Sequence, residues 1–363
     1  MKKFLLGSAL LLAFAPVVIG ADLSEKLKMG DVKLKSAGPI AFAPEGILLV
    51  ADPKSATISG IATGDTSATA KGAKYSIEKI GDKLAGALGV TTKEIQVADM
   101  AINPLSGNAY FSILRGQGDQ ASGVILRVTP EGKVEEVKTE GVRVTSVTLP
   151  NPGKDEQGRR GNPRTESITD LAYIDGKVWV AGLSNEEFAS KLRGIPFPFA
   201  AADKGASVEI YHGAHGAVET ASPVRTFAAF NIGGQDHLLA AYTCTPLVKF
   251  PIGGLKDGDK VRGTTIAELG NRNKPLDMVV YQKDGKNFVL LANSSRGVMK
   301  IKTDDIEKVD GITSRIADKA GLTYDTIDSL KGVEQLDRVN ETTVAILSKS
   351  PDGSYTLTSI ELP

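Results

Sequence analysis

The stretch Asp170-Leu-Ala-Tyr-Ile-Asp-Gly-Lys-Val-Trp-Val-Ala-Gly182 decides the fold. An apolar run leads into Asp-Gly, a strong signal for a two-residue β-hairpin turn, and a second apolar run follows. The same pattern returns at residues 40–52, 99–113, 226–242, 277–293 and 334–348. The six copies begin roughly 50 to 70 residues apart, which is typical of a repeat architecture. Each copy therefore predicts the inner hairpin of one repeated unit.

Six hairpins with alternating outer strands predict an all-β fold, a six-bladed β-propeller over residues 21–363. In the third repeat we expect a helical segment at 185–193 and the third strand at 208–211. The short alternating segment 31–35 has no hairpin of its own. We expect it to close the ring by pairing with the last blade, because closure removes exposed sheet edges. A seven-bladed ring is the alternative.

Composition narrows the class of protein. The chain has 363 residues with 43 Lys and Arg against 43 Asp and Glu, and 41% of its residues are hydrophobic. With equal numbers of basic and acidic residues, the chain does not have the strong positive net charge that is typical of nucleic-acid-binding proteins. A single cysteine excludes an intrachain disulfide and cysteine-rich zinc sites.

The first 20 residues have the pattern of a secretory signal peptide. Lys2 and Lys3 precede an apolar run at residues 4–19, and Gly20 is small enough to stand before a cleavage point. No later stretch is long and apolar enough for a membrane span. We therefore expect a periplasmic or secreted protein. A membrane anchor at the N-terminus is the alternative.

Acidic residues recur where the inner strands begin. In a closed ring these starts encircle the channel mouth, and the ends of the second strands lie nearby. The starts are Pro39, Asp99, Asp170, Thr226, Asp277 and Glu334, and Asp52 ends a second strand. Converging carboxylates favour one divalent cation, Ca²⁺ or Mg²⁺, held by Asp99, Asp170, Asp277, Glu334 and Asp52. Alternatively, each acid accepts backbone N–H groups from adjacent loops.

The inner hairpins, above all residues 42–52, resemble those of the NHL and SMP-30 (gluconolactonase-like) six-bladed propellers. The resemblance implies a site for one divalent cation and lactonase-type hydrolysis. In that family the cation is held by a Glu at the first inner strand with Asn and Asp from later blades, and Asp277 is in place for the late Asp. At the first strand this chain has Ala37-Gly38-Pro39, where the family has Glu-Gly-Pro.

Other candidate residues lie in the long connections on the same face. Arg272 and Lys274 present cations to the mouth, Asn293 ends a second strand, and Phe197 belongs to an aromatic stretch suited to a lid. Packing of that stretch against the next blade is the alternative.

Cys244 follows a second strand and could be a ligand, a reactive thiol or a small buried side chain. His212 and His215 suggest a transition-metal pair without a third ligand, or a solvated turn on the opposite face.

Two functions fit these residues. The first is an exported binding module that recognises a small molecule or a partner protein at the channel mouth. The second is a metal-dependent lactonase or esterase-like hydrolase, in which the cation would polarise a carbonyl. Because the early Glu and an obvious general base are missing, the sequence favours binding and leaves open whether the protein is an enzyme.

Overall fold

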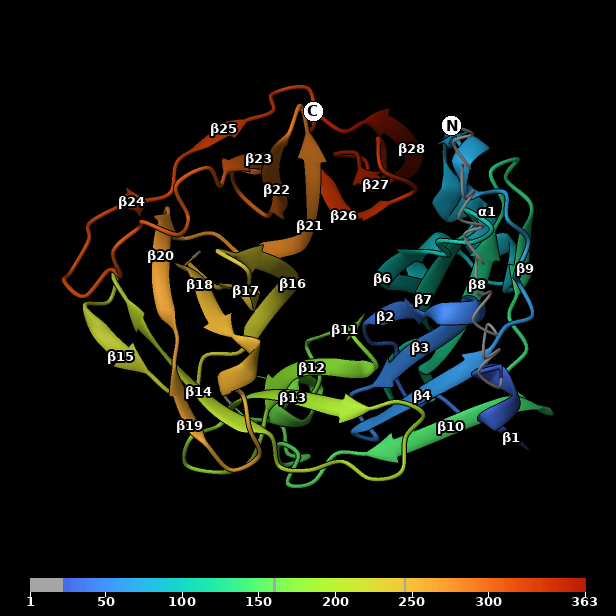
Figure 1. The fold of residues 1–363 in the computed structure, drawn as a ribbon. Helices are drawn as coiled ribbons and strands as arrows, with labels where there is room; N and C mark the ends of the chain where they lie inside the picture. Colours follow the sequence, from blue (N-terminus) through green and yellow to red (C-terminus); the bar gives the residue numbers. More distant parts are fainter. Residues whose placement is uncertain (1–21, 159–160, 245) are drawn as a thin grey trace, which may run out of the picture.

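The computed structural model describes residues 22–158, 161–244 and 246–363. The predicted signal peptide lies outside the described residues. The strands form six sheets arranged radially around a channel (Figure 1), which confirms the six-bladed propeller. Among the described residues, no helix is long and apolar enough to span a bilayer.

Each sheet is one blade, numbered by the chain order of its innermost strand. Blade 1 holds β2 (Ile40–Ala43), β3 (Ile47–Asp52), β4 (Thr57–Ala62), β10 (Val142–Thr148) and β1 (Lys28–Gly30). Blade 2 holds β6 (Ile95–Ile102), β7 (Ala109–Arg115), β8 (Ser122–Val128) and β9 (Val134–Glu136). Blade 3 holds β11 (Asp170–Ile174), β12 (Lys177–Leu183), β13 (Ser190–Pro196), β14 (Ala206–His212) and β15 (Ala217–Glu219), with β19 (Lys260–Arg262) parallel to β14.

The remaining blades follow the same plan. Blade 4 holds β16 (Val224–Ile232), β17 (Gln235–Tyr242), β18 (Pro246–Pro251), β20 (Thr264–Leu269) and β24 (Lys319–Gly321). Blade 5 holds β21 (Pro275–Lys283), β22 (Lys286–Asn293), β23 (Gly297–Lys302) and β25 (Tyr324–Thr326). Blade 6 holds β26 (Val333–Arg338), β27 (Thr343–Lys349), β28 (Tyr355–Glu361) and β5 (Ser76–Ile77).

Helices are few and short in the described part of the chain. The α-helix α1 (Ile80–Ala87) follows β5 and packs against blade 6 and the edge of blade 2. The 3-10 turns are η1 (Ser24–Lys26), η2 (Pro44–Gly46), η3 (Ala70–Gly72), η4 (Thr92–Glu94), η5 (Gly118–Gln120), η6 (Pro163–Glu166) and η7 (Ile252–Gly254).

The inner hairpins form as their turn residues dictate. Asp175 and Gly176, between β11 and β12, have φ of 47° and 76°, and Asp284 and Gly285, between β21 and β22, have 52° and 74°. Two consecutive positive φ values define the primed turns whose twist matches that of paired strands. The Asp-Gly signals in the sequence therefore fix the first two strands of these blades.

The blades do not follow one another around the ring in chain order. The inner strand β6 contacts β2 on one side and β26 on the other, whereas β11 contacts β2 and β16. The cyclic order is thus 1-2-6-5-4-3, and blade 1 lies between blades 2 and 3 (Figure 1). The chain leaves blade 2, returns through β10 as the fourth strand of blade 1, and only then enters blade 3.

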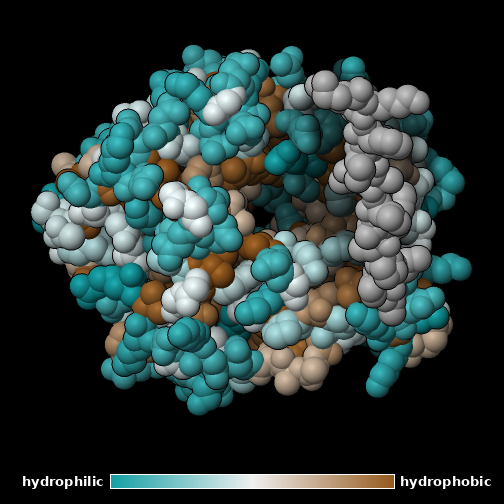
Figure 2. All heavy atoms as spheres, viewed as in Figure 1, coloured by the Kyte–Doolittle hydropathy of each residue, from teal (hydrophilic) through white to brown (hydrophobic). Residues whose placement is uncertain are grey.

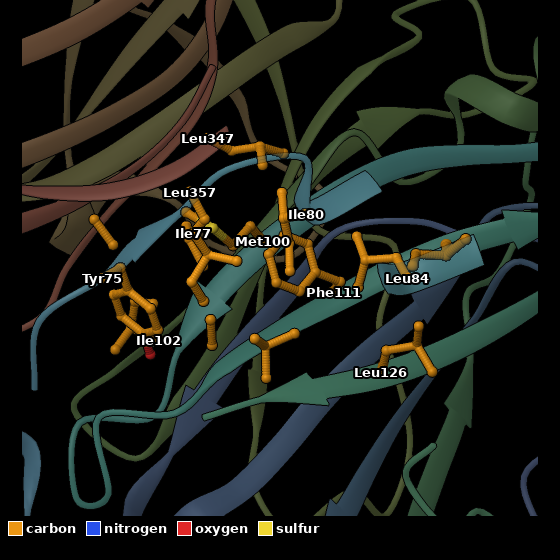
Figure 3. Close-up of a cluster of buried hydrophobic side chains, with 14 of the residues drawn as sticks. Tyr75, Ile77, Ile80, Leu84, Met100, Ile102, Phe111, Leu126, Leu347 and Leu357 are labelled. Atoms are coloured by element: carbon orange, nitrogen blue, oxygen red, sulfur yellow. The ribbon is translucent and has the colours of Figure 1, made fainter. Parts of the chain in front are cut away.

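The core consists of six apolar clusters, one between each pair of neighbouring blades. The cluster between blades 2 and 6 (Figure 3) includes Phe111 and Met100 from blade 2 and Leu347 and Leu357 from blade 6. Ile77 of β5 is buried in the same cluster. Burial of this interface ties the N-terminal part of the chain to its last strands.

Ring closure differs from the prediction. The outer strand of blade 6 is β5, in which Ile77 pairs with Leu357, and not residues 31–35. Those residues form no strand, and Val32 donates its N–H to Thr139 O and packs between blades 1 and 2. The apolar alternation at 31–35 thus serves the blade 1–2 cluster.

The third repeat also needs a correction. The expected helix at 185–193 is absent, because Ser190–Pro196 is the strand β13, paired along its whole length with β12. The strand at 208–211 belongs to β14 and is the fourth of blade 3. This changes the face on which the turn after β14 opens, since consecutive antiparallel strands run in opposite directions.

Candidate functional site

The channel encloses a cavity of about 1320 Å³. Figure 2 shows the hollow at the centre of the molecule. Four carboxylates from the inner strands line the cavity: Asp99, Asp170, Asp277 and Asp337. Lys71, Lys74 and Glu341 lie farther along the wall. We call the four aspartates the acidic ring.

Several small side chains line the channel, beside larger ones such as Phe42 and Tyr173. Side chains two residues apart on a strand face the same side. Two residues beyond Asp99, Asp170 and Asp277 stand Ala101, Ala172 and Val279, which also line the cavity. Ala41 of blade 1 adds a further small side chain. The wall below the acidic ring therefore leaves room for a ligand.

Each acid of the ring links two neighbouring blades. Asp99 accepts the N–H of Met100 on its own strand at 2.8 Å and that of Ile40 on blade 1 at 2.7 Å. The other three do the same across three further blade junctions: Asp170 with Leu171 and Phe227, Asp277 with Met278 and Leu336, and Asp337 with Arg338 and Ile102. Backbone capping by these acids, one of the two alternatives from the sequence, is therefore realised at four junctions.

The setting of the acidic ring disfavours full ionisation. Burial among the blades raises the pKa of Asp170 to about 8, and repulsion from Asp277 adds to this effect. Burial also raises the pKa of Asp99 and Asp277 well above the usual range, and the other ring acids add to this. The pKa of Asp337 rises only to about 6, because its N–H bonds and the Arg338 guanidinium oppose the effect of burial. A positively charged ligand would relieve this repulsion.

The expected acid Glu334 does not reach the channel. A register shift between Val333 and Gln335 turns Glu334 outward, where it accepts the Tyr355 hydroxyl at 3.0 Å. Gln335 takes the position in the ring that corresponds to Asp99 and Asp277. With its amide nitrogen turned toward them, Gln335 donates to Asp99 Oδ1 at 2.8 Å and Asp277 Oδ2 at 3.1 Å. Sequence reasoning also missed Asp337, although a period of two from Gln335 places it on the same wall.

Asp52 lies away from the ring. Its carboxylate accepts the N–H of Lys35 at 2.8 Å and the Ser36 hydroxyl at 2.5 Å, and so holds the end of β3 to the segment before β2. Of the five residues expected to hold a metal, the structure brings together Asp99, Asp170 and Asp277 in one cavity. Cation binding by these residues stays a prediction.

Four of the expected ligand-binding residues gather between blades 4 and 5. Cys244 donates its N–H to Asn273 O at 2.7 Å, and the Asn273 side chain donates to Asn293 Oδ1 at 3.0 Å. Asn273 stands between Arg272 and Lys274, which are exposed. Partial desolvation by the surrounding loop and repulsion from the nearby Arg225 lower the pKa of Lys274. None of these residues lines the channel cavity.

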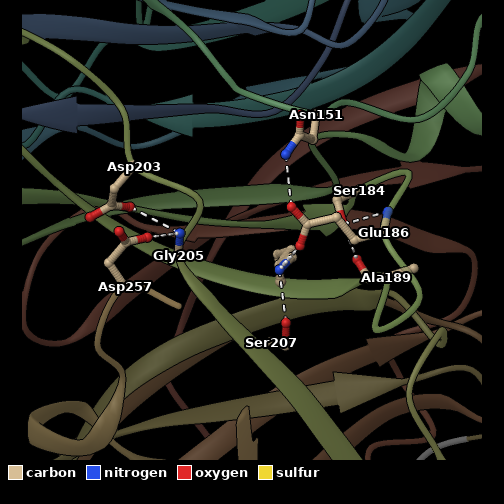
Figure 4. Close-up of polar contacts among 9 residues, drawn as sticks. Asn151, Ser184, Glu186, Ala189, Asp203, Gly205, Ser207 and Asp257 are labelled. Atoms are coloured by element: carbon tan, nitrogen blue, oxygen red, sulfur yellow. Dashed lines mark hydrogen bonds and ion pairs between the residues drawn. The ribbon is translucent and has the colours of Figure 1, made fainter. Parts of the chain in front are cut away.

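Phe197 packs in the core instead of forming a lid. It lies between blades 1 and 3 and makes edge-on contacts with Tyr173 and Phe199, at centroid distances of 6.1 and 5.1 Å. Figure 4 shows polar contacts of the residues that precede and follow this stretch, among them Glu186 and Gly205. There Glu186 binds Lys191 Nζ at 2.5 Å and Asn151 Nδ2 at 2.7 Å. This segment therefore serves the interface between blades.

No family model and no curated protein matches the chain. One similar solved structure is a GH43 glycoside hydrolase engineered for endo-xylanase and exo-arabinofuranosidase activity, with 10% identity, a TM-score of 0.33 and coverage of 70% of this chain. This chain spans about half of that structure, 48%. Another is the PQQ-bound aldose sugar dehydrogenase from Streptomyces coelicolor, with 13% identity, a TM-score of 0.29 and coverage of 92% of this chain and 96% of the other. Similarity at this level assigns no function, and the resemblance to NHL and SMP-30 propellers is not confirmed.

Proposed function

We propose that the protein is a binding protein whose central channel takes a small positively charged ligand, either an organic amine or a divalent metal ion. The observation that carries this proposal is the acidic ring: four carboxylates in one cavity, with raised pKa values and mutual repulsion. A bound cation would supply the positive charge that balances the negative charges of the ionised carboxylates. Its binding then favours their ionised forms.

The remaining acceptor capacity of the ring supports this proposal. Each ring carboxylate accepts two backbone N–H groups, and an ionised carboxylate offers about four acceptor positions. At Asp99 these two bonds come from Met100 and Ile40. The Gln335 amide takes a third position on Asp99 and on Asp277, so each of these two acids keeps about one position for ammonium or hydroxyl donors of a ligand.

The size of the cavity favours an organic ligand. Pockets for small molecules have volumes of about 300–1,000 Å³, and the channel at about 1320 Å³ exceeds this range. A lone ion would need several oxygens around one point. Here Gln335 bridges Asp99 and Asp277 with a neutral amide, so these two acids are already joined without an ion.

The metal-dependent hydrolase is the alternative that the sequence raises. It requires several acidic ligands close together. In the part of the chain that the structure describes, the group of His, Cys, Asp and Glu that could hold a metal is His212, His215 and Cys244, which lies outside the channel. We therefore put binding first. Export, a protein partner and the SMP-30-like assignment stay predictions.

Titration calorimetry tests the proposal with three probes: 1,4-diaminobutane, CaCl₂ and glucose. We expect the diamine to bind at pH 8 and to bind about tenfold more weakly at pH 5, because Asp170 and then Asp337, the ring acid with the lowest pKa, take up protons between these pH values and lose their negative charge. The variant Asp337→Asn should weaken binding at pH 8. The matched control is Glu334→Gln, which removes a carboxylate three residues away that does not line the channel.

The outcomes separate the candidates. Binding of calcium without the diamine would assign the ring to a metal and revive the hydrolase. Binding of glucose with equal affinity at both pH values and no binding of either cation would contradict the proposal.

A further inference from the structure

A second group of side chains meets between blades 3 and 4. The turn between β14 and β15 carries His212 and His215, and the connection between β17 and β18 carries Cys244. One ligand atom of each, a ring nitrogen or the Cys244 sulfur, lies within 4.8 Å of the other two. Because β14 is a fourth strand, its turn opens on the same face as the β17–β18 connection. The sequence had placed these residues on opposite faces.

His212 has a buried nitrogen without a partner. The residue is 2% exposed, and its Nδ1 lies 3.0 Å from Glu219 Oε1. Its Nε2 is buried and makes no hydrogen bond. Leaving a buried polar group without a hydrogen-bond partner costs free energy. A ligand that accepts the Nε2 lone pair would remove this cost.

A single carboxylate orients both imidazoles. Glu219 Oε1 also lies 2.5 Å from His215 Nδ1, and the Ser222 hydroxyl donates to the same carboxylate. The Nδ1 atoms of both rings are thus engaged by Glu219, and both Nε2 atoms are left as ligands. A carboxylate on the outer nitrogen is the usual support of a metal-bound histidine, since it fixes the tautomer and the ring orientation.

The thiol completes the group. Cys244 is half-buried, and its backbone is fixed by the N–H bond to Asn273 O. It is the single cysteine of the chain, so no intrachain disulfide competes for the sulfur. On the other side of the turn, the carboxylate of Glu268 is buried, with Oε1 accepting the Gly213 N–H at 2.5 Å and Oε2 unpaired. Positive charge is therefore missing here.

We propose that His212 Nε2, His215 Nε2 and Cys244 Sγ form a site for a transition-metal ion of the Zn²⁺ type. Two imidazoles and a thiolate suit Zn²⁺ and copper, whereas Ca²⁺ and Mg²⁺ prefer oxygen ligands. His215 is exposed, so the fourth position opens to solvent. Binding requires the thiolate, and the Cys244 proton passes to solvent when the metal–sulfur bond forms.

The test uses the reduced, chelator-treated protein with Zn²⁺ and Co²⁺ as probes. We expect one Zn²⁺ per chain and a Co²⁺ spectrum with a thiolate-to-cobalt charge-transfer band. Cys244→Ser should abolish that band. His215→Ala should weaken Zn²⁺ binding at least about tenfold, the scale of losing a group that supports the metal. Both positions are accessible, and thermal unfolding checks that the variants fold.

Three comparisons decide the outcome. His237→Gln is the matched control, since His237 binds Gln235 O at 2.9 Å and is not part of the group. Asp99→Asn separates this site from the acidic ring, and neither variant should change Zn²⁺ affinity. Co²⁺ binding without a thiolate band, unchanged Zn²⁺ affinity in both Cys244→Ser and His215→Ala, or no binding at all would overturn the proposal. Stoichiometric copper in place of zinc in the protein as isolated would identify the metal as copper at the same ligands.

Discussion

At the residue scale, Gln335 shows how one amide can replace a charge. It is the neutral donor between Asp99 and Asp277, and its neighbour Glu334 faces the Tyr355 hydroxyl outside the channel. We therefore expect Gln335→Glu and Glu334→Gln to have very different effects on the stability of the fold.

We predict that Gln335→Glu lowers the free energy of unfolding by about 1–3 kcal/mol at pH 8, because it replaces a half-buried donor to two ring acids with a further carboxylate. The loss should be smaller at pH 5, where the new group keeps its proton and can still donate. Thermal and urea unfolding at both pH values measure this. Glu334→Gln is the control and should leave the free energy of unfolding nearly unchanged at both pH values. An equal loss of stability in the two variants would show that the Gln335 amide does not stabilise the ring.

Asp170 links the ring to the pH dependence of stability. Its pKa is about 8 in the folded protein against a usual value of 3.8. Between these values the folded chain holds a proton that the unfolded chain has lost, so stability falls as pH rises from about 4 to about 8. Asp170→Asn removes this contribution. We predict that the variant is less stable than the native chain at pH 5, and that the deficit shrinks toward pH 8. A constant deficit across that range in urea unfolding would contradict the raised pKa.

The sequence predicted the ring only in part, for a local reason. The acids Asp99, Asp170 and Asp277 stand directly at the start of an apolar run and were found by inspection. The inner strand has a register shift directly before Asp99, Thr226 and Asp277, and the same shift in blade 6 makes Gln335, and not Glu334, the residue that corresponds to them. A shift of one residue reverses the face of a side chain, and no residue at 333–335 marks it.

At the element scale, the short strand β5 closes the ring. It contributes two residues to blade 6, and the neighbouring Tyr75 and Ser359 exchange hydrogen bonds, N–H to Oγ and N–H to O, both at 2.9 Å. Ile77 is 7% exposed and packs in the cluster between blades 2 and 6. Closure therefore combines sheet pairing with core burial.

We predict that Ile77→Ala costs about 2–5 kcal/mol, the range for removing a large buried aliphatic side chain. Met29→Ala, in the peripheral strand β1, is the control: Met29 is 67% exposed, and its loss should stay within about 0.5 kcal/mol. Urea unfolding gives both values. Comparable effects of the two changes would mean that β5 does not close the ring.

The sequence could not distinguish the closing element. Residues 31–35 alternate more clearly than Ser76 and Ile77, yet their apolar side chains are buried between blades 1 and 2. Periodicity reports that one face is buried and not which neighbour buries it. The same limit hid β13, since the polar residues before Ser190 masked a strand paired with β12.

At the scale of the whole molecule, the order of the blades is the feature that no repeat predicted. Six equivalent hairpins specify six blades, but the neighbour of each blade is set by long-range contacts. Blade 1 obtains its fourth strand from β10, which follows the whole of blade 2 in the chain. Ser59 Oγ and Ser146 Oγ lie 2.8 Å apart across this pairing.

We predict that Ser59→Cys with Ser146→Cys, in a Cys244→Ser background, forms a disulfide on oxidation, because directly paired residues of antiparallel strands meet the geometric requirement. Peptide mapping without reductant detects the crosslink. The control pair is Ser59→Cys with Ser112→Cys, since Ser112 belongs to blade 2. A crosslink in the control and none in the first pair would contradict the blade order.

The packing of blade 3 against blade 4 brings His212, His215 and Cys244 together. The two histidines lie at the turn between β14 and β15 and Cys244 in the connection between β17 and β18, and their meeting depends on β14 being the fourth strand of blade 3. Sequence spacing alone therefore gave a pair of histidines and a separate thiol.

Cation binding in the channel is tested most directly by a ¹³C NMR titration of the aspartate carboxyl groups, with and without 1,4-diaminobutane. We predict raised pKa values for the acidic ring, about 8 for Asp170 and about 6 for Asp337, and a fall in both when the diamine binds. The exposed Asp352, whose pKa is lowered by bonds from Ser354, should not respond. Ring acids that titrate in the ordinary range, or that ignore both the diamine and calcium, would contradict a cation-binding channel.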